Sequence, residues 1–464
     1  MSIGRGGFSS RLGFILAAAG SAVGLGNIWK FPFEVGQGGG AAFVLMYLVF
    51  CFVLCFPVMV AEIAIGRKTQ LNPVGAFKAL GHRKWAFIGY LGIASAVLIL
   101  SFYNVVAAWA FGYFVEIVLG HFDIGQRFGE FTADWITVGG YSTIFMMATA
   151  YVVSRGVSDG IERAAKILMP SLFVMILVLI LYALTLPNAM EGIRFYIVPD
   201  FSQITGVVVY SALGQAFFSL SVGMGLLMTY GSYLSKKANI VSAAAFITLM
   251  DVSVATLAGF MIFPFVFSLG IETDGGPGLI FVTLPGVFES LGPIFGPIVG
   301  GVFFLLLAFA AFTSTISVLE VPTAYMIDEK KMKRSNATWL VAIFVFILGI
   351  PSMLSMGAVD ALTHFIDLPG AGEMNFMDFV SLISSDTFLP LVGFLIAVFT
   401  AYVWKTENFN LEIANGDQSI KGSWLQSYVN FAIGYICPVL LGSIFIVTVF
   451  DNFLGIKVLT LLPG

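Results

Sequence analysis

The fold of this chain is decided by one stretch of sequence, Gly20-Ser21-Ala22-Val23-Gly24-Leu25-Gly26-Asn27. It lies inside an apolar segment that runs from about residue 12 to residue 33. A helix that crosses a bilayer must satisfy every backbone N–H and C=O group internally. Glycines followed by an asparagine disfavour a continuous helix there, because each Gly costs roughly 1 kcal/mol relative to Ala. Freed carbonyls at such a break can hold a cation, and the N-terminus of a half-helix can hold an anion. The alternative is that Gly20 and Gly24 serve only close helix packing.

The composition indicates a polytopic membrane protein. Of the 464 residues, 59% are hydrophobic and only 10% are charged, whereas soluble domains carry about 25% charged residues. The first apolar segment is long and no small-residue cleavage site follows it, so we expect a retained helix and not a signal peptide. The three cysteines lie in apolar segments without metal-ligand spacing and are expected to pack in the core.

About eleven apolar segments are long enough, at about 20 residues each, to cross a bilayer. They cover residues 11–33, 41–66, 86–119, 138–154, 165–187, 205–234, 238–270, 296–326, 337–354, 384–404 and 428–452. Cytoplasmic loops are rich in Lys and Arg. All of the 22 basic residues except Lys30, Arg127, Arg194 and Lys457 lie on the cytoplasmic side if the N-terminus does. We therefore expect a multi-pass protein of the cell (inner) membrane, with its N-terminus in the cytoplasm and, for eleven spans, its C-terminus outside.

A second broken helix is expected in the sixth segment. Its sequence is Gly214-Gln215-Ala216-Phe217-Phe218-Ser219-Leu220-Ser221-Val222-Gly223-Met224-Gly225. A five-helix unit that is repeated with inverted topology brings such breaks together at the middle of the membrane, as in many secondary transporters. We predict an all-α polytopic membrane protein with an inverted five-plus-five helix repeat. Its single transporter domain covers residues 1–464, with repeats at about 11–187 and 205–404 and an extra helix at about 428–452.

Asp251 is an ionisable residue that lies inside an apolar segment, the seventh. An unpaired carboxylate in a membrane costs several kcal/mol, so it either takes up a proton or binds a cation such as Na⁺. Glu62 and Glu320 are comparable, but structural roles are expected for them. The hydroxyls of Thr313 and Ser314 either bond to carbonyls of their own helix or offer oxygen ligands to a second cation.

These motifs together resemble the neurotransmitter:sodium symporter family, in particular its bacterial amino-acid transporters of the leucine-transporter type. The resemblance begins at Arg11-Leu12-Gly13, continues through the Gly20 stretch and Ile28-Trp29-Lys30-Phe31-Pro32 to residues 38–43, and returns at residues 214–221 and 313–314. It implies the inverted repeat with broken helices 1 and 6 and one extra span. It also implies a sodium-coupled symporter, not an enzyme, that imports a neutral amino acid or amino-acid-like substrate by alternating access.

The resemblance also implies the residues of the binding sites. One Na⁺ site would use Ala22, Asn27, Ser219 and Asp251 with the substrate carboxylate. A second would use Gly20, Val23, Ala310, Thr313 and Ser314. The substrate would contact Ser21, Ala22, Leu25, Gly26, Ile99, Tyr103, Phe218, Ser219, Ser221, Met224, Ser314 and Val318. Because Ile99 is stiff and Met224 is flexible, we expect a small to medium aliphatic substrate side chain.

Two gates are implied by the same resemblance. On the outer side Lys30 replaces the arginine that is usual in the family, and Asp378 is its expected partner, with Asp386 as the alternative. On the inner side the gate residues would be Arg5, Ser232, Tyr233 and Asp328, and Phe8 replaces the usual tryptophan.

No chloride requirement is expected. Animal relatives hold Cl⁻ in a cage that this chain matches in part, with Tyr47, Gln215 and Ser219. Asp251 stands where those relatives have a neutral asparagine, and Ala255 where they have serine. A fixed carboxylate would supply the negative charge that balances Na⁺, and it would repel Cl⁻ from the same place.

Two other functions are compatible with the sequence at this point. One is a proton-coupled carrier of the same fold, with Asp251 as the titrating group, and a less favoured one is a channel or receptor. The expected partners are a small molecule with a carboxylate and the lipid bilayer, and no nucleic acid.

Overall fold

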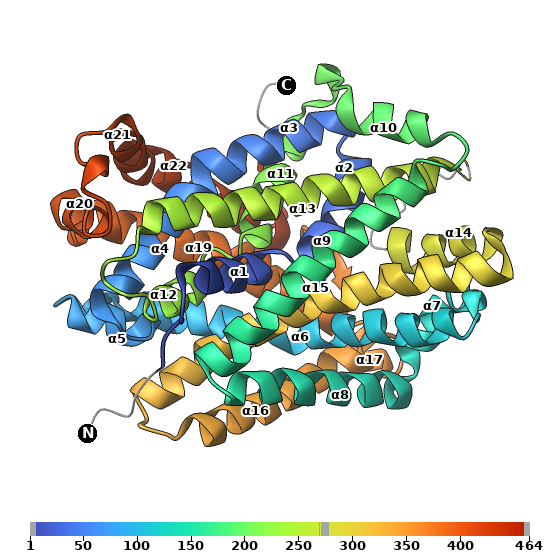
Figure 1. Ribbon diagram of the computed structural model, residues 1–464, viewed down its shortest axis with the longest axis horizontal. Helices are drawn as coiled ribbons and strands as arrows, with labels where there is room; N and C mark the ends of the chain where they lie inside the picture. The colour runs from blue at the N-terminus through green and yellow to red at the C-terminus, as the bar shows by residue number, and fades with distance from the viewer. Residues whose placement is uncertain (1–5, 269, 271–277, 459–464) are drawn as a thin grey trace.

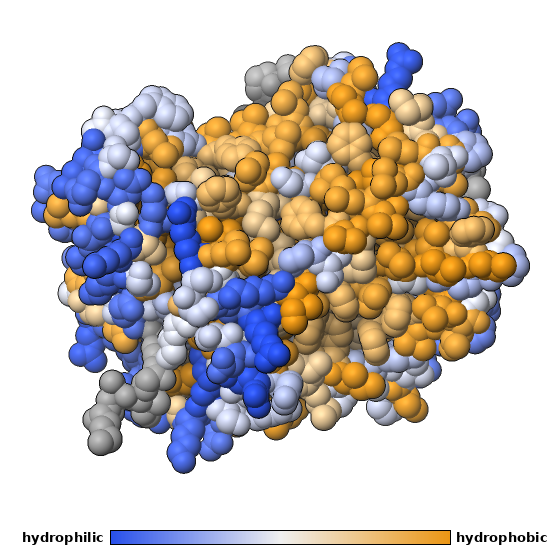
Figure 2. All heavy atoms as spheres, viewed as in Figure 1, coloured by the Kyte–Doolittle hydropathy of each residue, from blue (hydrophilic) through white to orange (hydrophobic). Residues whose placement is uncertain are grey.

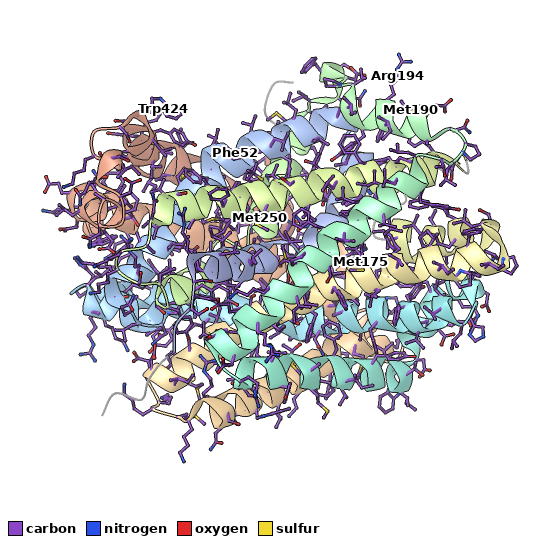
Figure 3. The ribbon with its side chains drawn as sticks, viewed as in Figure 1. Phe52, Met175, Met190, Arg194, Met250 and Trp424 are labelled. Carbon is purple, nitrogen blue, oxygen red and sulfur yellow. The ribbon has the colours of Figure 1, made fainter. Side chains whose placement is uncertain are left out.

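The computed structural model describes residues 6–268, 270 and 278–458. Its long helices run side by side across the molecule (Figure 1). Hydrophobic side chains form a broad exposed band across them, and hydrophilic side chains gather mainly at the ends (Figure 2). Outward-facing side chains of the long helices include Met175, Met250 and Phe52 (Figure 3), as expected for a surface that faces lipid.

The first half of the chain consists of helices apart from its connections. They are α1 (Arg11–Ala22), η1 (Gly26–Lys30), α2 (Phe31–Gln37), α3 (Ala41–Phe50), η2 (Cys51–Cys55), α4 (Phe56–Thr69), α5 (Pro73–Ala79), η3 (Arg83–Trp85), α6 (Ala86–Val118), η4 (Phe122–Ile124), α7 (Phe128–Ala133), α8 (Trp135–Ser154), η5 (Val157–Glu162), α9 (Arg163–Ala183), α10 (Ala189–Ile197) and η6 (Phe201–Gln203).

The second half repeats this pattern and adds one short antiparallel hairpin, in which Ile366 lies opposite Met374. Its elements are α11 (Gly206–Ser219), α12 (Leu226–Gly231), α13 (Ile240–Ser268), η7 (Leu279–Thr283), α14 (Leu284–Ser290), α15 (Gly292–Asp328), α16 (Arg334–Leu354), α17 (Asp360–Thr363), β1 (Ile366–Leu368), β2 (Gly372–Met374), α18 (Phe376–Ser381), η8 (Leu382–Phe388), α19 (Leu389–Val398), η9 (Phe399–Val403), α20 (Thr406–Ile413), α21 (Trp424–Phe431), η11 (Ala432–Ile436) and α22 (Cys437–Thr448).

Nine helices of the described residues are long and apolar enough to cross a membrane, and the bent pair of α1 with Gly26–Gln37 makes ten. The predicted segment that this criterion misses is 205–234, which forms α11 and α12. Neither of these two helices is long enough to span alone. The sixth predicted span is therefore a pair of short helices with a gap, and the prediction of two broken helices is confirmed.

Proline positions explain several π-helical turns, which are wider than α-helical turns, in the spanning helices. Each of η1, η2, η7, η8 and η11 is a π-helical turn that ends directly before a helix with proline at its second residue. These prolines are Pro32, Pro57, Pro285, Pro390 and Pro438. Proline lacks an N–H and its ring displaces the carbonyl four residues back, so the preceding turn widens.

Helix α1 lies in the interior of the bundle, where it packs against α9, α13 and α15 (Figure 1). Its residues from Gly13 to Ala22 are buried on almost every side, as expected for a helix that is apolar all round. The side-chain hydroxyl of Ser10 caps it by accepting the N–H of Gly13 at 3.0 Å. This placement puts the Gly20 stretch at the centre of the protein.

Candidate functional site

The first break covers Val23 to Leu25, between α1 and η1, and bends the helix by 48°. Side chains satisfy two of its N–H groups. The Gly24 N–H donates to Asn27 Oδ1 at 3.0 Å, and the Leu25 N–H donates to the Tyr103 hydroxyl at 2.9 Å. A Cβ on Gly24 would lie 2.4 Å from Ser314 Oγ. This glycine therefore allows two polar side chains to approach the open backbone.

The second break covers Leu220 to Gly225, between α11 and α12. Three of its residues have left-handed backbone: Ser221 (φ 54°), Gly223 (φ 91°) and Gly225 (φ 71°). Glycine adopts this conformation freely, whereas serine does so at a cost. The Gly223 N–H donates to Glu62 Oε1 at 2.7 Å. Glu62 therefore supports the second break, a role that no local pattern around it indicated.

Asp251 joins the two breaks through hydrogen bonds. Its carboxylate accepts the Asn27 amide at 2.8 Å, the Tyr47 hydroxyl at 3.0 Å and the Ser219 hydroxyl at 3.0 Å. Asp251 is fully buried. Within the described part of the chain, no Lys, Arg or His forms an ion pair with it. A buried carboxylate with donors but no cation favours binding of a positive ion.

The second predicted ion site is assembled around Thr313. Its hydroxyl lies 3.0 Å from the Ala310 carbonyl and 3.4 Å from the Val23 carbonyl. A Cβ on Gly20 would lie 3.3 Å from Thr313 Cβ, so the Gly20 backbone is adjacent. Ser314, which was predicted for both this ion site and the substrate cavity, donates its hydroxyl to the Ser21 carbonyl at 3.1 Å and lines the cavity.

These two oxygen clusters suit a hard cation. Among the described residues, no group of three or more His, Cys, Asp or Glu converges. Carbonyl, hydroxyl, amide and carboxylate oxygens are the ligands available, and such oxygens suit hard cations better than soft transition metals.

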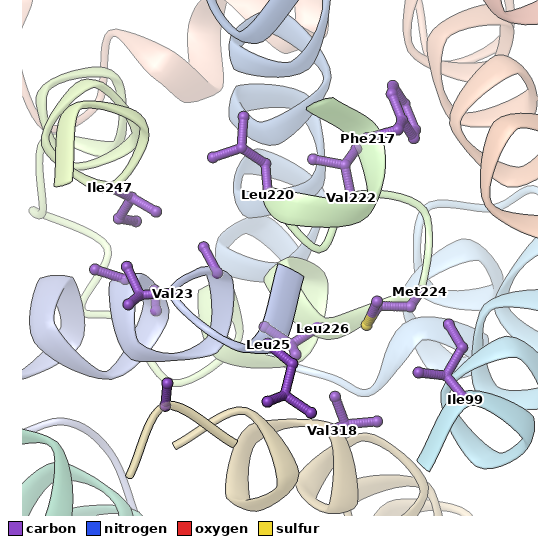
Figure 4. Close-up of a cluster of buried hydrophobic side chains, with 14 of the residues drawn as sticks. Val23, Leu25, Ile99, Phe217, Leu220, Val222, Met224, Leu226, Ile247 and Val318 are labelled. Atoms are coloured by element: carbon purple, nitrogen blue, oxygen red, sulfur yellow. The ribbon is translucent and has the colours of Figure 1, made fainter. Parts of the chain in front are cut away.

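A cavity of about 390 Å³ lies between the two breaks. Figure 4 shows part of its apolar wall, including Ile99, Met224 and Val318. Its lining residues are Ser21, Ala22, Gly24, Gly26, Ile99, Leu100, Tyr103, Phe218, Ser219, Ser221, Met224, Ser314 and Val318. This set includes every predicted substrate residue except Leu25, which contributes its N–H to Tyr103. Gly24 and Leu100 were not predicted, although each is the neighbour of a predicted residue.

Hydroxyl groups give the cavity a polar side. The Ser221 hydroxyl donates to the Ser21 carbonyl at 3.2 Å, as does the Ser314 hydroxyl. The Ser21 hydroxyl is buried and has no partner among the described residues. None of the described residues that line the cavity is charged, so a bound molecule would meet neutral groups and any ions that lie beside it.

A larger hollow of about 1090 Å³ lies next to this cavity and is lined by Lys30, Glu34, Asp378 and Asp386 among others. Lys30 Nζ lies 4.9 Å from the centre of the Phe218 ring. The Asp378 carboxylate accepts the Asn375 amide at 2.8 Å. Both acids share this hollow with Lys30, and the engagement of Asp378 by Asn375 favours Asp386, the alternative partner.

The opposite end of the molecule is closed by packed and paired side chains. The Tyr233 hydroxyl donates to Glu320 at 2.5 Å, and Glu320 pairs with Arg334 at 2.7 Å. The Asp328 carboxylate accepts the Asn72 N–H at 2.8 Å. Sequence reasoning missed Arg334 and Asn72 as gate partners, because their contacts join distant helices.

Ser232 and Phe8, which were also predicted at this end, make contacts of other kinds. The Ser232 hydroxyl donates to the Thr229 carbonyl within its own turn, at 2.6 Å. The Phe8 ring packs edge-on against Phe14 and Tyr230. Arg5 lies outside the described residues.

Comparisons with known proteins identify close relatives. The family model described as "Sodium:neurotransmitter symporter family" matches residues 5–124 and 137–454. An uncharacterized sodium-dependent transporter of Bacillus subtilis (strain 168) is 36% identical over 456 residues, which cover 97% of this chain and 98% of that protein. The human sodium- and chloride-dependent GABA transporter 2 is 26% identical over 78% of this chain and 69% of that protein.

A solved structure shows the same architecture. The crystal structure of MhsT in complex with L-phenylalanine has a TM-score of 0.87 and 42% sequence identity, and it covers 96% of this chain and 100% of that one.

Proposed function

Because this chain belongs to the sodium:neurotransmitter symporter family, we propose that it imports a neutral amino acid or a close analogue by alternating access, driven by Na⁺. The family is one of sodium-dependent membrane transporters and not of enzymes. Na⁺-coupled transport therefore follows from membership, and the substrate and the site residues are the proposal.

The observation that carries the proposal is the buried Asp251 beside the first break. Its three hydrogen-bond donors orient the carboxylate but leave its charge unbalanced. A Na⁺ held by Asp251, Asn27, Ser219 and the Ala22 carbonyl would balance that charge. A second Na⁺ held by Thr313, Ser314 and the carbonyls of Gly20, Val23 and Ala310 would bind α1 to α15, which pack together.

The cavity suits a zwitterion with a neutral side chain. The substrate carboxylate would bind at the first Na⁺, at the backbone of Leu25 and Gly26, and at the Tyr103 hydroxyl. The amine would meet carbonyls released at the two breaks. Apolar Ile99, Leu100, Met224 and Val318 would contact the substrate side chain.

Aliphatic and aromatic substrates can be compared directly to test the size of the substrate side chain. An aliphatic ligand is predicted from Ile99 and Met224, whereas the related MhsT was crystallised with L-phenylalanine. Competition between labelled leucine and unlabelled phenylalanine for uptake would rank the two. A tenfold preference for the aromatic ligand would contradict the predicted size.

The proposed transport cycle uses the two ends of the molecule in turn. The large hollow would face the outside, with Phe218 and the Lys30–Asp386 pair closing over the cavity. The network of Tyr233, Glu320 and Arg334 would open on the cytoplasmic side, where we place the N-terminus. The repeats of about 11–187 and 205–404 would move relative to each other, with the helix at about 428–452 outside them.

Uptake into sealed vesicles tests the proposal. Purified full-length protein is reconstituted, a Na⁺ gradient is imposed, and a panel of labelled amino acids is offered in buffers with and without chloride. We expect accumulation above equilibrium that requires Na⁺ and does not require chloride. Accumulation that follows a proton gradient and ignores Na⁺ would favour the proton-coupled reading. Flux that never exceeds equilibrium would indicate a channel.

A further inference from the structure

A groove runs between two helices on the outer surface of the bundle. Helices α8 and α16 lie side by side along one edge of the molecule (Figure 1). One hollow between them, of about 390 Å³, is lined by Met146, Met147, Trp339, Ile343 and Phe346 among others. Met147 and Ile343 are more than half exposed. The groove is therefore apolar and open at the level of the membrane.

The same groove continues along the helices. A second hollow, of about 1170 Å³, shares Thr143 and Phe346 with the first and extends to Trp135. From Trp135 to Met147 the groove follows α8 for roughly 18 Å, at 1.5 Å per residue. This length exceeds half the thickness of a hydrocarbon core of about 30 Å, so the groove reaches from the Trp135 end of α8 past the middle of the membrane, and the acyl chain of a lipid in the opposite leaflet enters it at Met147 and Trp339.

Basic residues without ion pairs lie beyond the end of the groove that Met147 and Trp339 line. Arg334 donates to the Val153 carbonyl at 3.1 Å, which holds the start of α16 against the end of α8. This contact brings Arg155 and Lys333 to the same corner of the molecule. Both are exposed, and neither forms an ion pair within the described part of the chain. Lys330 and Lys331 extend the positive charge, and Asp159 is the exposed acid nearby in the sequence.

Aromatic residues mark the depth of this corner. Trp339 lies six residues after Lys333, and Tyr151 lies four residues before Arg155, whose guanidinium is 6.0 Å from the Tyr151 ring. Tyrosine and tryptophan gather where hydrocarbon meets headgroups. The charges therefore lie at headgroup level, roughly 9 Å along α16 from the first aromatic of the groove.

We propose that the α8–α16 groove binds an anionic phospholipid. One acyl chain lies along Met147, Trp339 and Ile343, and the phosphate lies between Arg155 and Lys333. Charge complementarity selects the headgroup, because each basic residue near a membrane surface attracts an anionic lipid by roughly 1 kcal/mol, or about fivefold. The site is separate from the transport cavity, so its test does not depend on the transported substrate.

Fluorescence quenching tests this proposal. The full-length protein is reconstituted in phosphatidylcholine vesicles that contain either phosphatidylglycerol or phosphatidylcholine with brominated acyl chains. The signal of Trp339 is obtained as the difference from the Trp339→Phe variant. We expect brominated phosphatidylglycerol to reach half-maximal quenching at a mole fraction at least about fivefold lower than brominated phosphatidylcholine.

Charge and groove variants separate the two halves of the site. Arg155→Gln with Lys333→Gln should abolish the preference for phosphatidylglycerol. The matched pair Lys237→Gln with Lys421→Gln, at exposed residues elsewhere in the sequence, should keep it. Thr143→Phe, which fills the groove without changing charge, should weaken quenching by both lipids.

The opposite results would overturn the proposal. These are equal quenching by the two lipids, a preference that survives the Arg155 and Lys333 changes, and a preference that the control pair also loses. In a further measurement, soluble glycerol phosphate is added to compete with the lipid headgroup. If the soluble anion removes the preference, the corner binds free phosphate and not a lipid.

Discussion

The first break has three residues and no left-handed backbone, whereas the second has six residues, three of them left-handed. Their supports differ as well. Asn27 and Tyr103 bind the N–H groups of the first break, and Asn27 also contacts Asp251. The second break is held by Glu62 and by close backbone contact, since a Cβ on Gly223 would lie 2.5 Å from the Leu389 carbonyl.

Because their supports differ, the conformations of the two breaks should depend differently on bound Na⁺. The groups that shape the first break also surround the proposed Na⁺ site, so occupancy of that site should stabilise it. The second break is supported by groups of the protein alone. Ion removal should therefore affect the first break, and loss of Glu62 the second.

Asp251→Asn should have the largest effect. Two unit charges about 4 Å apart at an effective dielectric of 20 interact by about 4 kcal/mol, which is roughly a thousandfold in Na⁺ affinity. We expect uptake to be abolished or to become dependent on added Cl⁻. The measurement is Na⁺-driven uptake in gluconate and in chloride buffer, with Asp378→Asn as a control that keeps chloride-independent uptake.

Two results would contradict this charge argument. One is wild-type uptake that collapses in gluconate, whatever the variant does. The other is an Asp251→Asn protein that transports at the wild-type rate in gluconate.

Thr313→Ala combined with Ser314→Ala should come next in size. Two hydroxyl ligands are lost, at about 1 kcal/mol each, so the Na⁺ concentration for half-maximal uptake should rise about thirtyfold. Ser317→Ala is the matched control, because its hydroxyl donates to the Thr313 carbonyl within the same helix. Unchanged Na⁺ dependence in the double variant would remove these residues from the second ion site.

Glu62→Ala and Asn27→Ala should separate the two breaks by stability. Loss of Glu62 leaves the buried Gly223 N–H without a partner, at a cost of about 1–3 kcal/mol. Thermal unfolding in detergent should show that loss equally in NaCl and in choline chloride. Asn27→Ala should instead remove the stabilisation that Na⁺ provides.

Glu62→Gln serves as the conservative control, since its amide oxygen still accepts the Gly223 N–H. It should lose less stability than Glu62→Ala. The comparison fails if Glu62→Ala removes the Na⁺ effect and Asn27→Ala retains it.

Substitutions of Ser221 should have the smallest effect. Glycine and alanine both remove its hydroxyl, but only alanine keeps the cost of a left-handed backbone, about 1–2 kcal/mol. Ser221→Gly should therefore unfold at a higher temperature than Ser221→Ala. At Ser232, whose φ is −67°, alanine should be the better replacement. The same ranking at both serines would show that backbone strain at Ser221 is absent.

The sequence by itself determined the membrane class and the two broken helices, and the family resemblance that it carries implied nearly all of the residues that line the cavity. The family resemblance is confirmed by the match over residues 5–124 and 137–454. These features are local or carried by a specific motif. Glycine, asparagine and proline act on the backbone around them, and an apolar run of about 20 residues requires a helix in lipid.

Tertiary structure alone decided which side chains meet across helices. Lys30 lines one hollow with both Asp378 and Asp386, and the sequence could not decide between the two acids, because the π-helical residues Leu382–Phe388 alter the helix rotation between them. The pairs Glu320–Arg334 and Asp328–Asn72 and the direction of Ser314 were likewise not readable from the sequence. Such contacts depend on how each helix is rotated and where its turns widen, and packing of the whole bundle sets both.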